Sequence, residues 1–354
     1  MTFHAEAFVL EEASGFAALE SEPAAALDDE CVLRLVPKHG SGARDVHVRY
    51  ALTGAAGAPV VVVQGGISAD RYATAQRGRA GWWDALIGPD RAIDTSRFRV
   101  LSIEWLERAD LEGADLEGGD LEGADGELRA VGSEDQADAI AALLKQLDIR
   151  CAHAFVGASY GAMVALAFAA RHPTRVRRLV AIAGAHRAHP LAVAVRNLQR
   201  EIVRLAQSYG DAGAGLDLAR RLAMTTYRGE REFAERCADA PTFRDGRYRF
   251  AEEDWLNAAG ASFVKRFSAE RFLSLSESID LHAVAPEDVR VPTTLIGIAS
   301  DRLVPLADLC ELQRRCGAPA TLHVVDSRYG HDAFLKETQA LAPLVGEAIL
   351  TQGA

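Results

Sequence analysis

The sequence predicts an α/β fold: a mostly parallel central sheet with helices on both faces and an inserted helical segment. Continuous apolar runs such as "APVVVVQGG" and "FRVLSIEWL" are typical of strands buried on both faces. Amphipathic helical stretches alternate with these runs. A block with helical periodicity, residues 187–285, separates two groups of strands. We therefore expect a core formed by residues 1–186 and 286–354, with a helical lid at 187–285.

The individual elements follow in order. "CVLRLV" and "DVHVRYAL", within residues 31–54, alternate apolar and polar residues and predict an antiparallel start to the sheet. "SEDQADAIAALLKQLDI" predicts a helix from about Glu134, with Ser133 as its cap. "CAHAFVG" and "RVRRLVAIAGA" predict the next two strands. "VPTTLIGIASD" and "ATLHVVDSRYGH" predict the last two, and "DAFLKETQALAPLVGEAIL" predicts a closing helix.

The length and the net charge of the chain limit the classes of function that it can have. The chain has 354 residues, 49% of them hydrophobic, enough for a sizeable core. Its net charge is -11, and residues 107–135 account for -9 of it, with eleven acids against two arginines. The remainder is nearly neutral, so we expect no nucleic-acid partner. The near-repeat "ADLEGADLEGGDLEGADGE" has too few copies to bury a core as a solenoid, and we interpret 107–135 as a solvated acidic loop.

Cysteine usage and the N-terminus indicate the compartment. The N-terminal stretch "MTFHAEAFVLEEASGF" lacks the basic start and apolar core of a signal peptide. No window approaches the roughly 18 apolar residues of a membrane span. The cysteines contain no CxxC pair and suggest no disulfide framework; they are Cys31, Cys151, Cys237, Cys310 and Cys316. We expect a cytoplasmic protein without a membrane partner.

The stretch "FVGASYGAMVALAFAARHP" places a serine between a predicted strand and a predicted helix. Gly157 and Gly161 lie two residues before and after Ser159. A sharp strand-to-helix turn needs small residues at these positions, because the strand and the helix nearly touch there. Such a nucleophile elbow exposes the serine hydroxyl and directs the next backbone N–H, that of Tyr160, at the bond under attack.

A nucleophilic serine needs a histidine base and a carboxylate that orients it, and the chain supplies both downstream. Asp301 follows the strand "TTLIGIAS", and His331 follows "TLHVV" through a short loop. Strand ends at one sheet edge converge in space, so we predict a triad of Ser159, Asp301 and His331. Asp326, which also ends a strand, is the alternative carboxylate.

Two further stretches contain candidate site residues. The loop "QGGIS" after the first buried strand should supply a second oxyanion donor, the N–H of Gly66 or Ile67. His186 and His189 form an HxxH fragment, but no third ligand stands at a characteristic spacing, so we predict no metal site.

With these residues placed, the chain resembles the α/β-hydrolase superfamily and, more narrowly, its MetX-type homoserine O-acyltransferases. The similarity covers most of residues 45–350. It includes "GWWDALIGPDRAIDTSRFRVL", the predicted helix before the elbow and "NLQREI" at the lid entrance. "RFSAERFLSLSESIDLH" and "YGHDAFL" match later signatures of that family.

The resemblance implies a ping-pong transfer of an acyl group from acyl-CoA, a co-substrate rather than a bound cofactor, to the hydroxyl of homoserine in methionine biosynthesis. Ser159 would carry the acyl group. By the same motif matching, Asp332 would bind the ammonium group of the acceptor and Arg200 its carboxylate, with Arg196 as the alternative arginine. Tyr227, in "TTYRG", would line the tunnel. A zwitterion needs one anion and one cation, and arginine binds carboxylates in bidentate fashion.

Two departures from the family pattern refine these expectations. The elbow "GASYGA" carries Tyr160 and Ala162, similar to succinyl-transferring members, so we expect succinyl-CoA rather than acetyl-CoA as donor. The acidic near-repeat replaces a glycine-rich loop of the family, so contacts made there do not carry over. The alternative functions are an acetyl-CoA-dependent homoserine or serine O-acyltransferase and an esterase or thioesterase on the same fold. The resemblance and the apolar lid helices also predict a homodimer.

Overall fold

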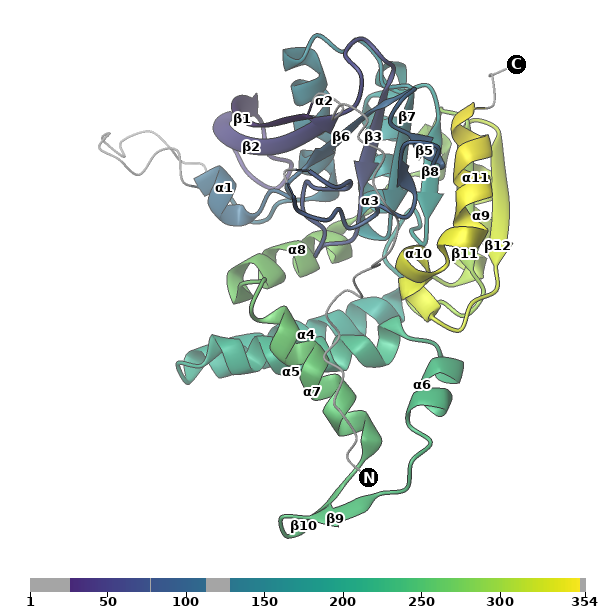
Figure 1. The fold of residues 1–354 in the computed structure, drawn as a ribbon. Coiled ribbons are helices and arrows are strands. Elements are labelled where there is room, and N and C mark those ends of the chain that lie inside the picture. Colours follow the sequence, from purple (N-terminus) through teal and green to yellow (C-terminus); the bar gives the residue numbers. More distant parts are fainter. Residues whose placement is uncertain (1–25, 77, 113–127, 351–354) are drawn as a thin grey trace, which may run out of the picture.

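A sheet of eight strands runs through the protein (Figure 1). The computed structural model describes residues 26–76, 78–112 and 128–350. The strand order is β1-β2-β6-β3-β7-β8-β11-β12; β1–β2 and β2–β6 pair antiparallel, and every other neighbouring pair is parallel. The predicted mostly parallel sheet with an antiparallel start is therefore confirmed. The strands are β1 (Ala26–Leu35), β2 (Arg44–Thr53), β3 (Val60–Gln64), β6 (Arg99–Ile103), β7 (Ala154–Ala158), β8 (Leu179–Ile182), β11 (Thr293–Ile298) and β12 (Ala320–Val325).

Helices cover both faces because successive residues of the central strands point to opposite sides. In β3, Val60 and Val62 pack in one core cluster with the helices α2 (Ser133–Gln146) and α3 (Tyr160–Arg171). Val61 and Val63 pack in the other cluster with α11 (Thr338–Leu350) and with the segment around a small strand pair. The small strand pair consists of β4 (Ile87–Gly88) and β5 (Ile93–Asp94). Two further helices of the core are α9 (Leu306–Arg315) and α10 (Ala333–Lys336).

The start of α2 corrects one prediction. Gly132, not Ser133, is its N-cap residue, and the Asp135 carboxylate accepts a hydrogen bond of 2.7 Å from the Gly132 N–H. Ser133 is the first helical residue, and its hydroxyl lies 2.7 Å from Nδ1 of the buried His282. The Ser133 side chain therefore does not cap α2. It contacts His282 instead, at the end of the helical segment between β8 and β11.

The predicted acidic loop 107–135 is only partly within the described residues, which omit 113–127. On one side of the gap lies a short helix, α1 (Arg108–Glu112). On the other side Leu128, Ala130 and Val131 are buried while Arg129 is exposed, and Glu134 and Asp135 are buried as well. These two carboxylates are tolerated inside because Glu134 pairs with Lys38 and Asp135 accepts backbone N–H groups. The prediction of a solvated segment is wrong for this flank.

A helical segment lies between β8 and β11, below the carboxyl ends of the parallel strands in Figure 1. Its helices are α4 (Pro190–Ser208), α5 (Ala212–Tyr227), α6 (Glu230–Arg236), α7 (Ala251–Phe263) and α8 (Ala269–Leu281). α8 lies nearest the sheet, and its Phe272, Leu275 and Ile279 join the main core cluster. A short exposed hairpin, β9 (Thr242–Arg244) and β10 (Arg247–Arg249), stands at the far tip, where the sequence had predicted only helices.

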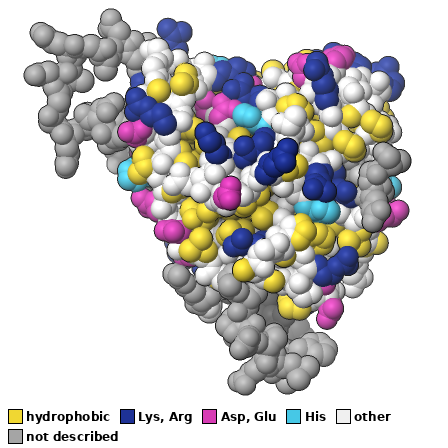
Figure 2. All heavy atoms as spheres, turned by 90° about the horizontal axis from the view of Figure 1, so that it is seen from above, with side chains coloured by type: hydrophobic (Ala, Val, Ile, Leu, Met, Phe, Trp, Pro, Cys, Tyr) yellow, Lys and Arg dark blue, Asp and Glu magenta, His cyan; other side chains and the backbone are white. Residues whose placement is uncertain are grey.

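The opposite edge of the sheet, at the amino ends of the parallel strands, carries a basic surface. Figure 2 views the molecule from this side and shows Lys and Arg side chains gathered across it. Arg97, Arg177, Arg178 and His153 line a cavity of about 490 Å³ there.

All five cysteines are free thiols. Within the described residues, no helix is long and apolar enough to cross a membrane.

Candidate active site

Ser159 stands at the sharp turn between β7 and α3, with φ of 56° and ψ of -120°. The backbone packs so tightly here that only glycine fits on either side. A Cβ on Gly157 would lie 2.2 Å from the Gly161 carbonyl oxygen, and one on Gly161 would lie 2.1 Å from the Gln64 carbonyl oxygen. Tyr160 is the first residue of α3, so its N–H belongs to the set that a helix leaves without an internal partner.

The structure brings Ser159, His331 and Asp301 into one hydrogen-bonded chain. Ser159 Oγ lies 2.7 Å from His331 Nε2, and His331 Nδ1 lies 2.7 Å from Asp301 Oδ2. The other carboxylate oxygen of Asp301 accepts the N–H groups of Leu303 at 2.8 Å and Val304 at 3.1 Å. These two bonds fix the carboxylate, which in turn fixes the ring of His331.

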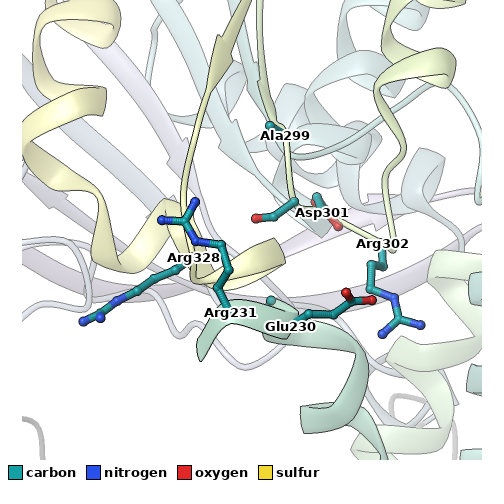
Figure 3. Close-up of a pocket in the computed structure, with 8 residues that line it drawn as sticks. Glu230, Arg231, Ala299, Asp301, Arg302 and Arg328 are labelled. Atoms are coloured by element: carbon teal, nitrogen blue, oxygen red, sulfur yellow. The ribbon is translucent and has the colours of Figure 1, made fainter. Parts of the chain in front are cut away.

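The alternative carboxylate, Asp326, lies elsewhere. Its side chain is 79% exposed and pairs with Arg231 at 3.4 Å. A cavity of about 330 Å³ adjoins this region, between the chain around Asp301 and the start of α6 (Figure 3). It is lined by Gly229, Glu230, Arg231, Ala299, Ser300, Asp301, Arg302 and Arg328. The Asp301 side chain itself is fully buried, so the triad does not open into this cavity through its carboxylate.

Local backbone geometry positions His331. Gly330 has a φ of +59°, and a Cβ there would lie 2.7 Å from the Tyr227 carbonyl oxygen, so the glycine lets the His331 loop pack against the end of α5. The Tyr227 ring lies beside the imidazole, with centroids 5.8 Å apart, and Phe334 approaches from another side at 6.0 Å. Tyr227 therefore lies next to His331, where it can line the predicted tunnel.

The electrostatic surroundings raise the pKa of His331. Burial alone lowers its pKa, because the charged imidazolium loses water. The negative charges of Asp301 and Asp332 outweigh burial, and Asp301 also accepts a hydrogen bond from the ring. Arg196 opposes them, and the net pKa stays above the ordinary value of 6.5.

The loop after β3 approaches the serine through Gly66. A Cβ on Gly66 would lie 3.9 Å from Ser159 Oγ, so the Gly66 backbone borders the Ser159 hydroxyl. Its carbonyl oxygen accepts the Trp105 indole N–H at 2.9 Å and the Ala69 N–H at 2.9 Å, which hold the loop. Ile67, the other predicted donor, packs its side chain partly against the main core.

Of the two candidate arginines for the acceptor carboxylate, Arg200 is engaged by other side chains. It donates from Nη1 to Asp280 Oδ2 at 2.6 Å and to Ser276 at 3.0 Å, within a buried network. Asp332 follows His331 and is buried, and its Oδ2 lies 2.9 Å from Arg228 Nε.

Arg196 and Arg220 both act on Tyr227, whose ring lies beside His331. Arg196 pairs with Asp280 at 2.6 Å through Nε, yet its buried Nη2 has no hydrogen-bond partner among the described residues. Its charge acts on both His331 and Tyr227. Arg220, which the sequence reasoning missed, lies 5.3 Å from the Tyr227 ring centroid. Its signal was the seven-residue spacing to Tyr227, two turns along one helix face.

The two histidines weighed as metal ligands have other partners. His189 caps α4 by accepting the Leu191 N–H, and the buried His186 lies 3.9 Å from Glu311. In residues 26–76, 78–112 and 128–350, no group of three or more His, Cys, Asp or Glu side chains is arranged to hold a metal ion.

The chain is similar to known proteins in sequence and in fold. A family model described as "alpha/beta hydrolase fold" matches residues 59–338. A homoserine O-succinyltransferase of Xanthomonas campestris pv. campestris is 46% identical over 339 residues, which cover 95% of this chain and 87% of that protein. The chain belongs to the homoserine O-acyltransferase family, within the α/β-hydrolase fold. The resemblance found in the sequence is thereby confirmed.

Two further members of the homoserine O-acyltransferase family share less sequence identity with this chain. A homoserine O-acetyltransferase of Mycobacterium sp. (strain KMS) is 33% identical over 315 residues, covering 81% of this chain and 84% of that protein. The crystal structure of homoserine O-acetyltransferase from Bacillus anthracis has a TM-score of 0.81 at 19% identity and covers 93% of this chain and 99% of its own. The predicted fold class is confirmed by these matches and by the sheet itself.

Proposed function

We propose that this protein transfers a succinyl group from succinyl-CoA to the hydroxyl of L-homoserine, as a step of methionine biosynthesis. The observation that carries the proposal is the chain of 2.7 Å contacts from Ser159 through His331 to Asp301. The succinyl donor is favoured because the succinyltransferase relative is 46% identical and the acetyltransferase relative 33%.

In the first step, His331 Nε2 takes the proton of Ser159 as the serine oxygen attacks the thioester carbon. Negative charge moves to the carbonyl oxygen, where the N–H groups of Tyr160 and Gly66 stabilise it. The carbon–sulfur bond then breaks. Coenzyme A leaves as the thiol with the proton from His331, and the succinyl group stays on Ser159 as an ester.

In the second step, the homoserine hydroxyl takes the place of the thiol. His331 removes the hydroxyl proton while the oxygen attacks the acyl-enzyme, and the same two N–H groups stabilise the second oxyanion. The intermediate collapses to O-succinylhomoserine, and the proton returns to Ser159. The helical segment below the strand ends shields the acyl-enzyme from water.

The acceptor is a zwitterion and needs a charged group for each end. Asp332, adjacent to His331, binds the ammonium group. For the carboxylate we favour Arg196 over Arg200, because Arg196 keeps a buried N–H group without a partner among the described residues while Arg200 is bound to Ser276 and Asp280. Arg220, beside Tyr227, can add to the positive charge there.

Asp332→Ala is expected to raise the KM for homoserine by about tenfold or more and to change the KM for succinyl-CoA little. The lost contact is a charge-assisted hydrogen bond to the acceptor ammonium, worth about 1.5–3 kcal/mol. Steady-state kinetics with each substrate varied in turn measure both constants. Equal increases in the two KM values would remove the ammonium-binding role.

The pH profile is expected to report the raised pKa of His331. The base acts in its neutral form, so kcat/KM for succinyl-CoA should fall as pH decreases through a pKa above the ordinary 6.5. Asp332→Asn removes one of the negative charges that raise this pKa, so the acid limb should move to lower pH. An acid limb that stays in place in Asp332→Asn would contradict this electrostatic assignment.

A thiol-release assay separates transfer from hydrolysis. Free coenzyme A is measured after mixing the protein with succinyl-CoA, with and without L-homoserine. The proposal expects sustained release only with homoserine, and faster release from succinyl-CoA than from acetyl-CoA. Release that ignores homoserine would leave an esterase or thioesterase, and preference for acetyl-CoA would make the protein an acetyltransferase.

We further propose a homodimer formed through α4. Leu191, Leu198 and Leu205 repeat every seven residues and are 59%, 54% and 62% exposed, so they form an unpaired apolar stripe along one helix face. Leu198→Glu with Leu205→Glu is expected to convert a dimer to a monomer in light scattering, with Leu335→Glu, an exposed leucine outside this stripe, as the control. A wild-type monomer would contradict the proposal.

The cytoplasmic location also belongs to this proposal. It is supported by the five free thiols, which are typical of a reducing compartment, and by the metabolic step proposed.

A further inference from the structure

We propose that the arginine-lined cavity beside the oxyanion loop binds the phosphate groups of the acyl-CoA donor. This inference rests on the proposed function, because it names where the nucleotide end of that substrate lies. The cavity measures about 440 Å³ and is lined by Arg49, Ser68, Ala69, Asp70, Arg71, Tyr72, Arg79, Glu104, Arg266, Phe267 and Arg271.

Three separate parts of the fold build this cavity. One wall is the continuation of the oxyanion loop, from Ser68 to Tyr72. A second comes from the strands, with Arg49 on β2 and Glu104 just after β6. The third comes from the helical segment, between the end of α7 and the first turns of α8. The cavity thus lies where the helical segment meets the core.

The side chains that line this cavity carry a net positive charge, which favours binding of an anion. Five arginines and two acids line it, and three of the five arginines are held in ion pairs, among them Arg79 with Asp70. Arg71 and Arg271 are bound to Glu104 at 3.3 and 3.0 Å and are largely buried, so they hold the walls together. Arg49 and Arg266 are exposed and have no ion pair within the described parts of the chain. These two guanidinium groups are available to a ligand.

Two aromatic rings pack among the paired arginines of the cavity. Tyr72 is contacted on its ring by Arg71 at 4.5 Å and by Arg79 at 4.6 Å. Phe267 also lines the cavity and stacks on Phe263. Arginines bind phosphates through paired N–H groups, so the exposed guanidinium groups of Arg49 and Arg266 give the cavity the chemistry of a phosphate site.

The cavity is also within reach of the nucleophile. Gly66, which borders Ser159, is two residues before the cavity residue Ser68. On the other side, α8 connects Arg271 to Ser278, about 10.5 Å further along the helix axis. The Ser278 hydroxyl lies 2.6 Å from that of Tyr160, the residue after the nucleophile. A thioester at Ser159 can therefore extend its flexible pantetheine arm toward the arginines.

The cavity behind Asp301 is less suited to this task. It also contains three arginines, but two of them are engaged: Arg231 pairs with Asp326 at 3.4 Å and Arg328 with Glu235 at 2.5 Å. Figure 3 shows Glu230 among the same side chains. An added anion would compete with these carboxylates.

A truncated donor tests the inference directly. The double variant Arg49→Gln with Arg266→Gln is compared with wild type using succinyl-CoA and using succinyl-pantetheine, which lacks the nucleotide and its phosphates. We expect the KM for succinyl-CoA to rise about tenfold or more, because each lost charge-assisted contact corresponds to about that factor. The KM for succinyl-pantetheine should stay unchanged. Arg177→Gln, an exposed arginine on the opposite basic surface, is the control for loss of positive charge.

Each outcome decides between supporting and rejecting the inference. An unchanged KM for succinyl-CoA, or equal increases for both donors, would overturn it while leaving the transfer activity intact. Calorimetric binding of adenosine 3′,5′-bisphosphate provides a readout that does not need turnover. Weaker binding by the double variant than by Arg177→Gln supports the site even if the wild-type protein transfers no acyl group, and equal binding rejects it.

Discussion

Replacing Ser159 by alanine is expected to lower kcat by about 10⁴-fold or more and to leave the protein folded. The variant removes the only oxygen that can carry the acyl group in the proposed two-step reaction. It keeps the tight packing at Gly157 and Gly161, and alanine accepts the same strained backbone at no greater cost than serine. Coenzyme A release and thermal unfolding together measure the two halves of this expectation.

Ser208→Ala, an exposed serine at the end of α4, is the matched control and should keep full activity. A Ser159→Ala protein that transfers succinyl groups at the wild-type rate would show that the acyl group passes through a different residue. Activity lost together with a large fall in melting temperature would instead indicate a structural role for the hydroxyl.

Asp301→Asn is expected to reduce kcat by about 10⁴-fold, a loss typical of removing this carboxylate from a serine triad. The amide oxygen of asparagine would accept the N–H groups of Leu303 and Val304, as Oδ1 of Asp301 does now. Its NH₂ group would then face His331 Nδ1 and force the proton onto Nε2. A protonated Nε2 cannot accept the proton of Ser159.

The control is Asp326→Asn, in the alternative carboxylate, which directly follows β12. That change should cost little activity, because the side chain is 79% exposed and pairs only at the surface with Arg231. A large loss in Asp326→Asn with little in Asp301→Asn would reverse the assignment.

The sequence predicts the fold and the triad residues because their physical requirements are local. Ser159 needs glycines two residues away on each side, and the calculated clashes of a Cβ with backbone oxygens at 2.2 and 2.1 Å give the reason. Likewise the residues that follow predicted strands lie at one sheet edge, which brings Asp301 and His331 together although 30 residues separate them.

The remaining site residues depend on tertiary packing that no local pattern reveals. Arg196 and Arg200 are one helical turn apart, and only their contacts with Asp280 on α8 distinguish them. The capping prediction for α2 failed for a similar reason. Gly132, the residue before Ser133, is the N-cap, and the Ser133 hydroxyl contacts His282, 149 residues away. For the arginines and for Ser133 alike, the role of the side chain depends on a contact with a residue distant in the sequence.

The proposed mechanism requires a succinyl ester on one serine, and mass spectrometry of the intact protein tests for it. The protein is mixed with succinyl-CoA in the absence of an acceptor, quenched in acid, weighed and then digested to locate the modification. The account predicts one added succinyl group on the peptide that contains Ser159, removed when homoserine is supplied. A stable succinyl group on another residue, or homoserine succinylated by a protein that never carries the group, would contradict it.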